Sequence, residues 1–102
     1  MSLNDYRDEA GDFLTKINAK NNSEDKIGML EEEFGLLKGA VDTPERLRHQ
    51  IYDMMFLLFE IASVHGFDLD EEWDKGRKRK QEKYLSKSWS LCLTTSFKVC
   101  WG

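Results

Sequence analysis

The sequence predicts an all-α protein built from four helices. Apolar residues recur at spacings of three and four along successive segments, no alternating strand pattern precedes residue 86, and the 102-residue chain contains a single proline. A chain of this length forms one domain and buries only a modest core by itself. We therefore expect one helical domain over residues 1–85, followed by a separate tail over residues 86–102.

The first two helices are predicted over residues 4–20 and 24–41. The apolar stripe of the first helix consists of Leu3, Tyr6, Ala10, Phe13, Leu14 and Ile17. Asn21, Asn22 and Ser23 interrupt the pattern and offer N-caps for the second helix. The expected core stripe of the second helix consists of Ile27, Leu30, Phe34, Leu37 and Val41. Glu33 projects from within this apolar half, so its carboxylate needs a partner.

A central helix is predicted over residues 43–65. Thr43 can act as its N-cap, Pro44 suits the first helical position, and Gly66 ends it. Apolar side chains surround most of this helix, so we expect it to be buried on several sides, one of them by a second subunit. The polar exceptions share one stripe and are Arg46, His49, Gln50, Asp53 and Glu60.

The second and central helices are joined by a short connection and should run antiparallel. Glu33 and Asp53 are therefore expected to meet across this helix pair. Their alternative roles are those of boundary residues paired with nearby cations, such as Lys38 or Arg46.

A fourth helix is predicted over residues 69–85, where Asp68 and Glu71 form a capping-box-like start. Its run from Lys75 to Lys83 is strongly basic, which is typical of a solvated or anion-facing segment. The tail over residues 86–102 is rich in Ser, Thr, Trp and Cys, and is either an extended piece packed on the helices or an appendage.

Composition argues against several classes of protein. The net charge of −4 gives no global bias toward nucleic acid or anionic membranes. The longest apolar run, Met54 to Phe59, is far shorter than the roughly 20 residues of a membrane-spanning helix. The two cysteines, Cys92 and Cys100, are too few for a zinc site. With no signal pattern at the N-terminus, we expect a cytoplasmic protein with reduced cysteines.

Three strings within residues 24–85 resemble a known family. They are LEEEFGLL at residues 30–37, HQIYDMMF at residues 49–56 and HGFDL at residues 65–69. This order and spacing is similar to that of the MazG-like all-α nucleoside triphosphate pyrophosphohydrolases. The resemblance implies a four-helix domain that assembles into a helical-bundle dimer or tetramer. It also implies cleavage of (d)NTP to (d)NMP and pyrophosphate, in nucleotide-pool house-cleaning.

The resemblance implies a metal site as well. In this family, Glu-x-x-Glu on one helix and Glu-x-x-Asp on the next hold Mg²⁺, or Mn²⁺ in its place. Here Glu33 and Asp53 stand at two of the four positions and would be catalytic metal ligands, whereas Leu36 and Gln50 occupy the other two. Gln50 can still offer a neutral oxygen to a metal.

The family also holds phosphates with basic residues near the end of its last helix. The string from Arg79 to Tyr84 resembles that pattern, so the resemblance assigns Arg79, Lys80 and Lys83 to substrate binding.

Two other functions remain open. One is a catalytically impaired relative that serves as a nucleotide-binding or protein-interaction module. The other is a small helical nucleic-acid binder that uses the basic run, although the acidic net charge argues against it.

Overall fold

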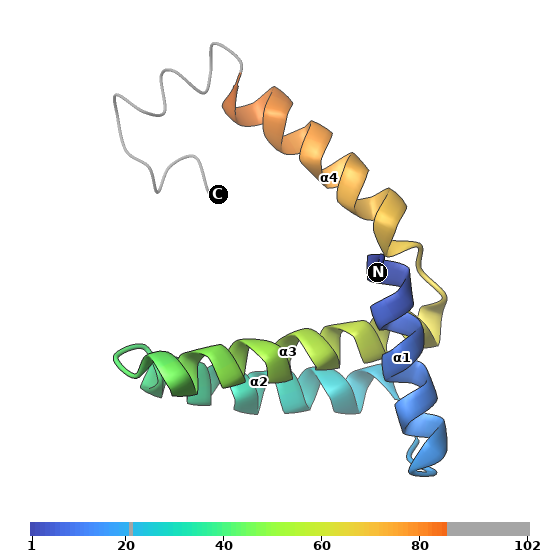
Figure 1. Ribbon diagram of the computed structural model, residues 1–102, viewed down its shortest axis with the longest axis vertical. Helices are drawn as coiled ribbons and strands as arrows, with labels where there is room; N and C mark the ends of the chain where they lie inside the picture. Colours follow the sequence, from blue (N-terminus) through green and yellow to red (C-terminus); the bar gives the residue numbers. More distant parts are fainter. Residues whose placement is uncertain (21, 86–102) are drawn as a thin grey trace. The chain divides into compact units, whose positions relative to one another are not determined.

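A computed structural model describes residues 1–20 and 22–85 of the chain. Within these residues it contains four α-helices and no strand, which confirms the predicted all-α class (Figure 1). The helices are α1 (Leu3–Lys16), α2 (Ser23–Gly39), α3 (Pro44–His65) and α4 (Leu69–Tyr84). The prediction about residues 86–102 lies outside the described part. No helix of the described part is long and apolar enough to span a membrane.

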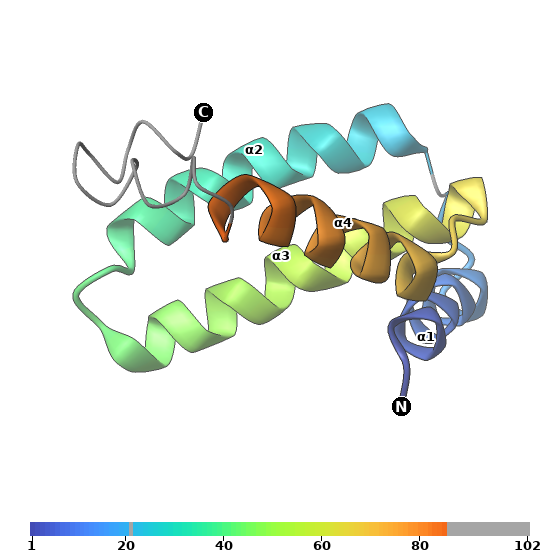
Figure 2. The same ribbon diagram turned by 90° about the horizontal axis from the view of Figure 1, so that it is seen from above.

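The chain divides into two units, which are described separately. The first runs from Met1 to Leu69 and contains α1, α2 and α3. The second begins at Asp70 and includes nearly all of α4. Within the first unit, both α1 and α2 pack on α3. α2 and α3 lie side by side and run in opposite directions, while α1 crosses them near the C-terminal end of α3 (Figures 1 and 2).

α1 begins as a capping box. The hydroxyl of Ser2 accepts a hydrogen bond from the Asp5 backbone N–H at 3.2 Å, and the Ser2 backbone N–H donates to the Asp5 carboxylate at 2.8 Å. α1 ends at Lys16 rather than at the predicted residue 20. The cause is Asn18, which adopts a left-handed backbone conformation with φ of 55°. Asn tolerates that region better than most residues, and it stops the helix here.

α2 and α3 begin, and α3 ends, within one residue of where the sequence predicts. The Asn22 side chain accepts hydrogen bonds from the first turn of α2. Pro44 occupies the start of α3, and Gly66 ends it in a left-handed conformation with φ of 63°. Thr43 stands at the N-cap position of α3, but its side chain makes no capping hydrogen bond.

α1 and α3 approach each other closely where Gly11 meets Ser63. A Cβ atom on Gly11 would stand only 2.2 Å from Ser63 Oγ and 3.2 Å from Ser63 Cβ, so a larger residue there would force Ser63 to move. Aromatic pairs extend the same interface: Tyr6 lies 5.9 Å from Phe59, and Phe13 meets Phe56 edge-to-face at 5.5 Å. α1 is therefore held against α3 by backbone proximity and by rings.

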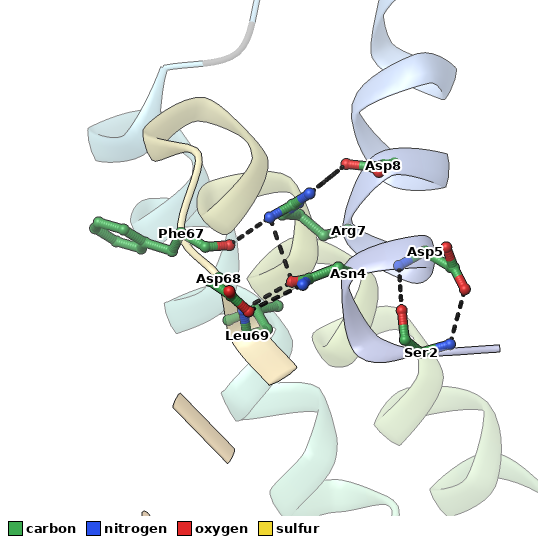
Figure 3. A network of polar contacts seen from close by, with 8 residues as sticks. All are labelled: Ser2, Asn4, Asp5, Arg7, Asp8, Phe67, Asp68 and Leu69. Atoms are coloured by element: carbon green, nitrogen blue, oxygen red, sulfur yellow. Dashed lines mark hydrogen bonds and ion pairs between the residues drawn. The ribbon is translucent and has the colours of Figure 1, made fainter. Parts of the chain in front are cut away.

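Polar contacts tie the start of α1 to the segment that follows α3 (Figure 3). Asn4 Nδ2 donates to Asp68 Oδ1 at 2.9 Å, and Asn4 Oδ1 accepts from the Leu69 backbone N–H at 2.8 Å. Arg7 Nη1 donates to the Phe67 carbonyl at 2.7 Å. Because Leu69 is the first residue of α4, Asn4 supplies a cap to that helix from 65 residues away.

The predicted core stripe of α2 is wrong for three of its five members. Ile27, Phe34 and Val41 are 50%, 49% and 62% exposed, whereas Lys26 is only 8% exposed. α2 is thus rotated so that Lys26 and Glu33, rather than this apolar stripe, lie toward α3. On α3, three apolar residues that share one face are also exposed, namely Ile51, Met55 and Leu58. α1 and α2 thus cover two sides of α3 within the described chain, and burial of the remaining face by a second subunit stays a prediction.

The close contact at Gly11 yields a stability prediction. Gly11→Ala should lower the free energy of unfolding by about 1–3 kcal/mol, because the added methyl group overpacks the α1–α3 interface. The loss should be smaller in a Ser63→Gly background. Urea denaturation followed by circular dichroism measures both effects.

Gly28→Ala is the matched control, because a Cβ at that position of α2 would meet nothing within 4 Å. This variant should gain helix propensity and be as stable as the wild type or slightly more so. If Gly11→Ala behaved in the same way, the close approach would be refuted.

Candidate functional site

α1, α2 and α3 line one open groove of about 1030 Å³. It brings Glu33 of α2 and Asp53 of α3 to one site, as their expected antiparallel placement implies. Aromatic and aliphatic side chains form much of its wall, including Phe13, Met29, Tyr52, Phe56 and Leu57. The remaining polar residues of the wall are Asp5, Asp8, Glu9, Asp12, Lys16, Lys26 and Glu60. We call this the α1–α3 groove.

Glu33 is held across the helix pair by Gln50. The Gln50 side-chain Nε2 donates to the Glu33 carboxylate and also to the Glu33 backbone carbonyl, the latter at 3.1 Å. Gln50 is buried, with 7% of its surface exposed, while Glu33 is partly buried, so this double contact is partly shielded from water. The amide therefore fixes the orientation of the Glu33 carboxylate and occupies part of its hydrogen-bonding capacity.

Asp53 lies one turn further along α3 than His49. His49 Nε2 is 3.2 Å from Asp53 Oδ2, an i,i+4 contact on the helix surface. The His49 side chain is mostly exposed and that of Asp53 is about one-third exposed. Asp53 is therefore accessible to a ligand from the groove, and His49 can orient its carboxylate.

Lys26 and Glu60 form a buried ion pair in the same groove. Lys26 Nζ is 2.7 Å from Glu60 Oε2, and the two side chains are only 10% and 5% exposed. Our sequence analysis placed Glu60 on the polar stripe of α3 but did not single out Lys26. The available signal was spacing: Lys26 precedes Glu33 by seven residues, and Glu60 follows Asp53 by seven. Residues seven apart lie two turns apart on one face of a helix.

The groove is strongly acidic on its α1 side. Asp5, Asp8, Glu9 and Asp12 line it from that helix. Hydrogen bonds from the backbone N–H and the side chain of Ser2 lower the pKa of Asp5 below its ordinary value of 3.8, so this group is charged at neutral pH. An anionic ligand can enter such a groove only if cations balance these charges.

The described residues contain no group of three or more His, Cys, Asp or Glu side chains placed to hold a metal ion. Leu36 is 55% exposed and faces a smaller groove, which Gln50 and His49 also line. The Leu36 side chain is aliphatic and supplies no metal ligand. Two carboxylates, those of Glu33 and Asp53, are therefore the donors that the motif positions bring to the α1–α3 groove.

The basic residues of α4 make contacts within their own helix. Arg79 Nη2 is 3.0 Å from Glu72 Oε1, and the Lys83 ammonium lies 5.3 Å from the centre of the Tyr84 ring. A hydrogen bond from Lys75 to Glu71 raises the pKa of Lys75. α4 belongs to the second unit, so the assignment of Arg79, Lys80 and Lys83 to substrate phosphates stays a prediction.

We compared the chain with protein-family models, with curated proteins and with solved structures, and none of them matches it.

The buried ion pair yields a second stability prediction. Lys26→Met or Glu60→Met alone should lower the free energy of unfolding by about 3–5 kcal/mol, because each leaves an uncompensated buried charge. The double variant should recover most of this loss. A double-mutant cycle in urea measures the coupling.

Lys75→Met is the matched control, because its ion pair with Glu71 is exposed on α4. It should leave the stability almost unchanged. Additive losses at Lys26 and Glu60 would contradict a buried, coupled pair.

Proposed function

We propose that this protein is a MazG-like nucleoside triphosphate pyrophosphohydrolase. It would cleave (d)NTP between the α and β phosphates, releasing (d)NMP and pyrophosphate, and so serve nucleotide-pool house-cleaning. The observation that supports the proposal is that Glu33 and Asp53, the two carboxylates retained from the family pattern, line one groove from neighbouring antiparallel helices. The groove has room for a ligand beside them and apolar walls that suit a nucleoside.

The residues present fit Mg²⁺ or Mn²⁺ only in a site that the substrate completes. Mg²⁺ is commonly bound by one or two carboxylates together with substrate phosphates and waters, rather than by an all-protein cage. Glu33 and Asp53 would supply the carboxylates. Gln50, the other donor that the family pattern suggests, lines the smaller groove beside Leu36. When bound, the metal neutralises charge on the phosphates and activates water. Metal affinity should accordingly be low without nucleotide.

The chain's own residues then have distinct tasks. Gln50 holds the Glu33 carboxylate in place through its buried amide. His49 restrains Asp53 from the same helix. Such fixed side chains reduce the reorganisation that a reaction requires, because orientation is set before the substrate binds. Arg79, Lys80 and Lys83 are proposed to contact the phosphates, as the family pattern implies.

A catalytically impaired relative, acting as a nucleotide-binding or protein-interaction module, is the second candidate. Two observations favour it. Leu36 is an exposed apolar residue at a position where the family has a carboxylate, and the Gln50 amide takes up part of the hydrogen-bonding capacity of the Glu33 carboxylate. In this case the groove would bind nucleotide without turnover.

We also propose that the protein forms a homodimer or homotetramer. The support is the large apolar side chains that the first unit leaves exposed, among them Ile27 and Phe34 on α2, Val41 in the turn after it, and Ile51, Met55 and Leu58 on one face of α3. Exposed apolar surface of this kind marks an interaction site in soluble proteins.

Turnover tests the enzyme directly. Purified protein is incubated with a panel of ribo- and deoxynucleoside triphosphates and Mg²⁺ or Mn²⁺, and monophosphate and pyrophosphate are measured. We expect turnover in the wild type that falls by about a hundredfold or more in Asp53→Asn or Glu33→Gln. Glu31→Gln, which changes an exposed acid of α2 outside the groove, should leave it unaffected.

The same assay separates the two candidates. A folded wild type that binds nucleotide without cleaving it would contradict the enzyme. Turnover that appeared only in a Leu36→Glu/Gln50→Glu variant would identify an impaired relative whose missing carboxylates can be restored.

Light scattering at micromolar concentration tests assembly. We expect a dimer or tetramer that Leu58→Lys dissociates, because a charge would be buried in the apolar face. Val64→Lys, which lies six residues further along and on another side of α3, should not dissociate it. A monomeric wild type would refute the proposed assembly.

A further inference from the structure

Charge is distributed unevenly in the α1–α3 groove. Its wall carries seven acidic residues but only two lysines, Lys16 and Lys26. Lys16 is exposed in the last turn of α1. Lys26 is buried, so its ammonium is the cation that the fold keeps inside the groove. A polyphosphate in this groove needs a fixed positive charge, and Lys26 is placed to provide one.

The contact with Glu60 prepares Lys26 for such a role. The 2.7 Å ion pair holds a side chain that would otherwise be flexible, so little conformational entropy is left to lose when a ligand binds. An ammonium carries three N–H donors, more than one carboxylate oxygen engages. Lysine is a frequent phosphate ligand because it acts as a compact point charge.

The register of the two helices places Lys26 at a fixed distance from the carboxylates. Lys26 and Glu33 are seven residues apart on α2, as are Asp53 and Glu60 on α3. Each spacing is two helical turns, or about 10 Å along the axis. Glu33 and Asp53 therefore lie at one position along the helix axes, and the Lys26–Glu60 ion pair lies about 10 Å further along them.

We propose that Lys26 is a phosphate-binding residue of the α1–α3 groove, held in position by its ion pair with Glu60. The ligand class is a polyphosphate, and its identity as a nucleoside triphosphate rests on the proposed function. This assignment is independent of the basic residues of α4. The ion pair lies in the wall of the groove, so Lys26 can contact a ligand there while Glu60 holds its side chain in place.

The test uses inorganic triphosphate as the probe, with the same concentration of Mg²⁺ for every variant, because the acidic groove admits an anion only when cations balance its charge. Isothermal titration calorimetry on the full chain compares the wild type with Lys26→Met/Glu60→Met, which removes both charges and leaves no buried ion unpaired. We expect binding by the wild type that weakens about tenfold or more in the double variant, the loss of a charge-assisted hydrogen bond. Lys26→Arg should retain most of the affinity.

Lys16→Met is the matched control, because it removes the other lysine of the groove wall. Its effect should be several-fold smaller than that of the double variant. Equal losses would show that Lys26 contributes no more to binding than the exposed Lys16 does, and would overturn the assignment. An unchanged affinity in the double variant, or no binding by the wild type, would overturn it as well.

A second measurement needs no destabilised variant. In the wild-type chain, the NMR signal of the Lys26 Cε methylene, assigned by comparison with Lys26→Arg, should shift when triphosphate is added. A signal that stays still while triphosphate binds would overturn the proposal.

Failure of the proposed function would give a different pattern. Triphosphate binding that depends on Lys26, in a protein that cleaves no nucleoside triphosphate, would refute the enzyme and leave this assignment standing. Turnover with the same KM in the wild type and the double variant would refute the assignment of Lys26 and leave the enzyme standing.

Discussion

The interface between α2 and α3 is built around polar side chains that must satisfy one another. Lys26 pairs with Glu60, and Glu33 accepts a hydrogen bond from Gln50, both across the helix pair. The ion pair is buried and the hydrogen bond is partly buried. A buried charge without a partner is costly, so these contacts restrict how α2 can rotate and slide against α3. The rotation and register of α2 in turn decide what lies in the groove and what lies outside it.

Two features follow from this one constraint. Because Lys26 and Glu33 lie on the side of α2 that faces α3, Glu33 and Asp53 line a common groove with α1. The same orientation of α2 also leaves Ile27 and Phe34 exposed on this helix, and Val41 exposed in the turn that follows it. A site and an exposed apolar face thus arise together, which is why the proposed activity and the proposed assembly have the same structural origin. α1 completes the groove because the close contact of Gly11 with Ser63 fixes it on α3.

Sequence reasoning located the helices because strong local signals mark their ends. Pro44 and Gly66 bound α3 as expected, whereas the left-handed Asn18 shortened α1. Periodicity did not reveal which apolar stripe of α2 would be buried, since it cannot distinguish a face that meets the same chain from one that meets a partner. Glu33 and Asp53 line the same groove because a short connection makes α2 and α3 antiparallel, and their role as a site stays a prediction. Lys26 was missed because a lone lysine is ordinarily exposed.

The central claim is that Glu33 and Asp53 form a substrate-completed metal site within the α1–α3 groove. The most direct test is a crystal structure of the full chain with Mn²⁺ and a nucleoside triphosphate analogue that resists cleavage between the α and β phosphates. The account predicts an anomalous Mn²⁺ peak within about 2.0–2.2 Å of oxygens from both carboxylates and from the phosphates. Nucleotide bound elsewhere, or Mn²⁺ that contacts neither carboxylate, would contradict it.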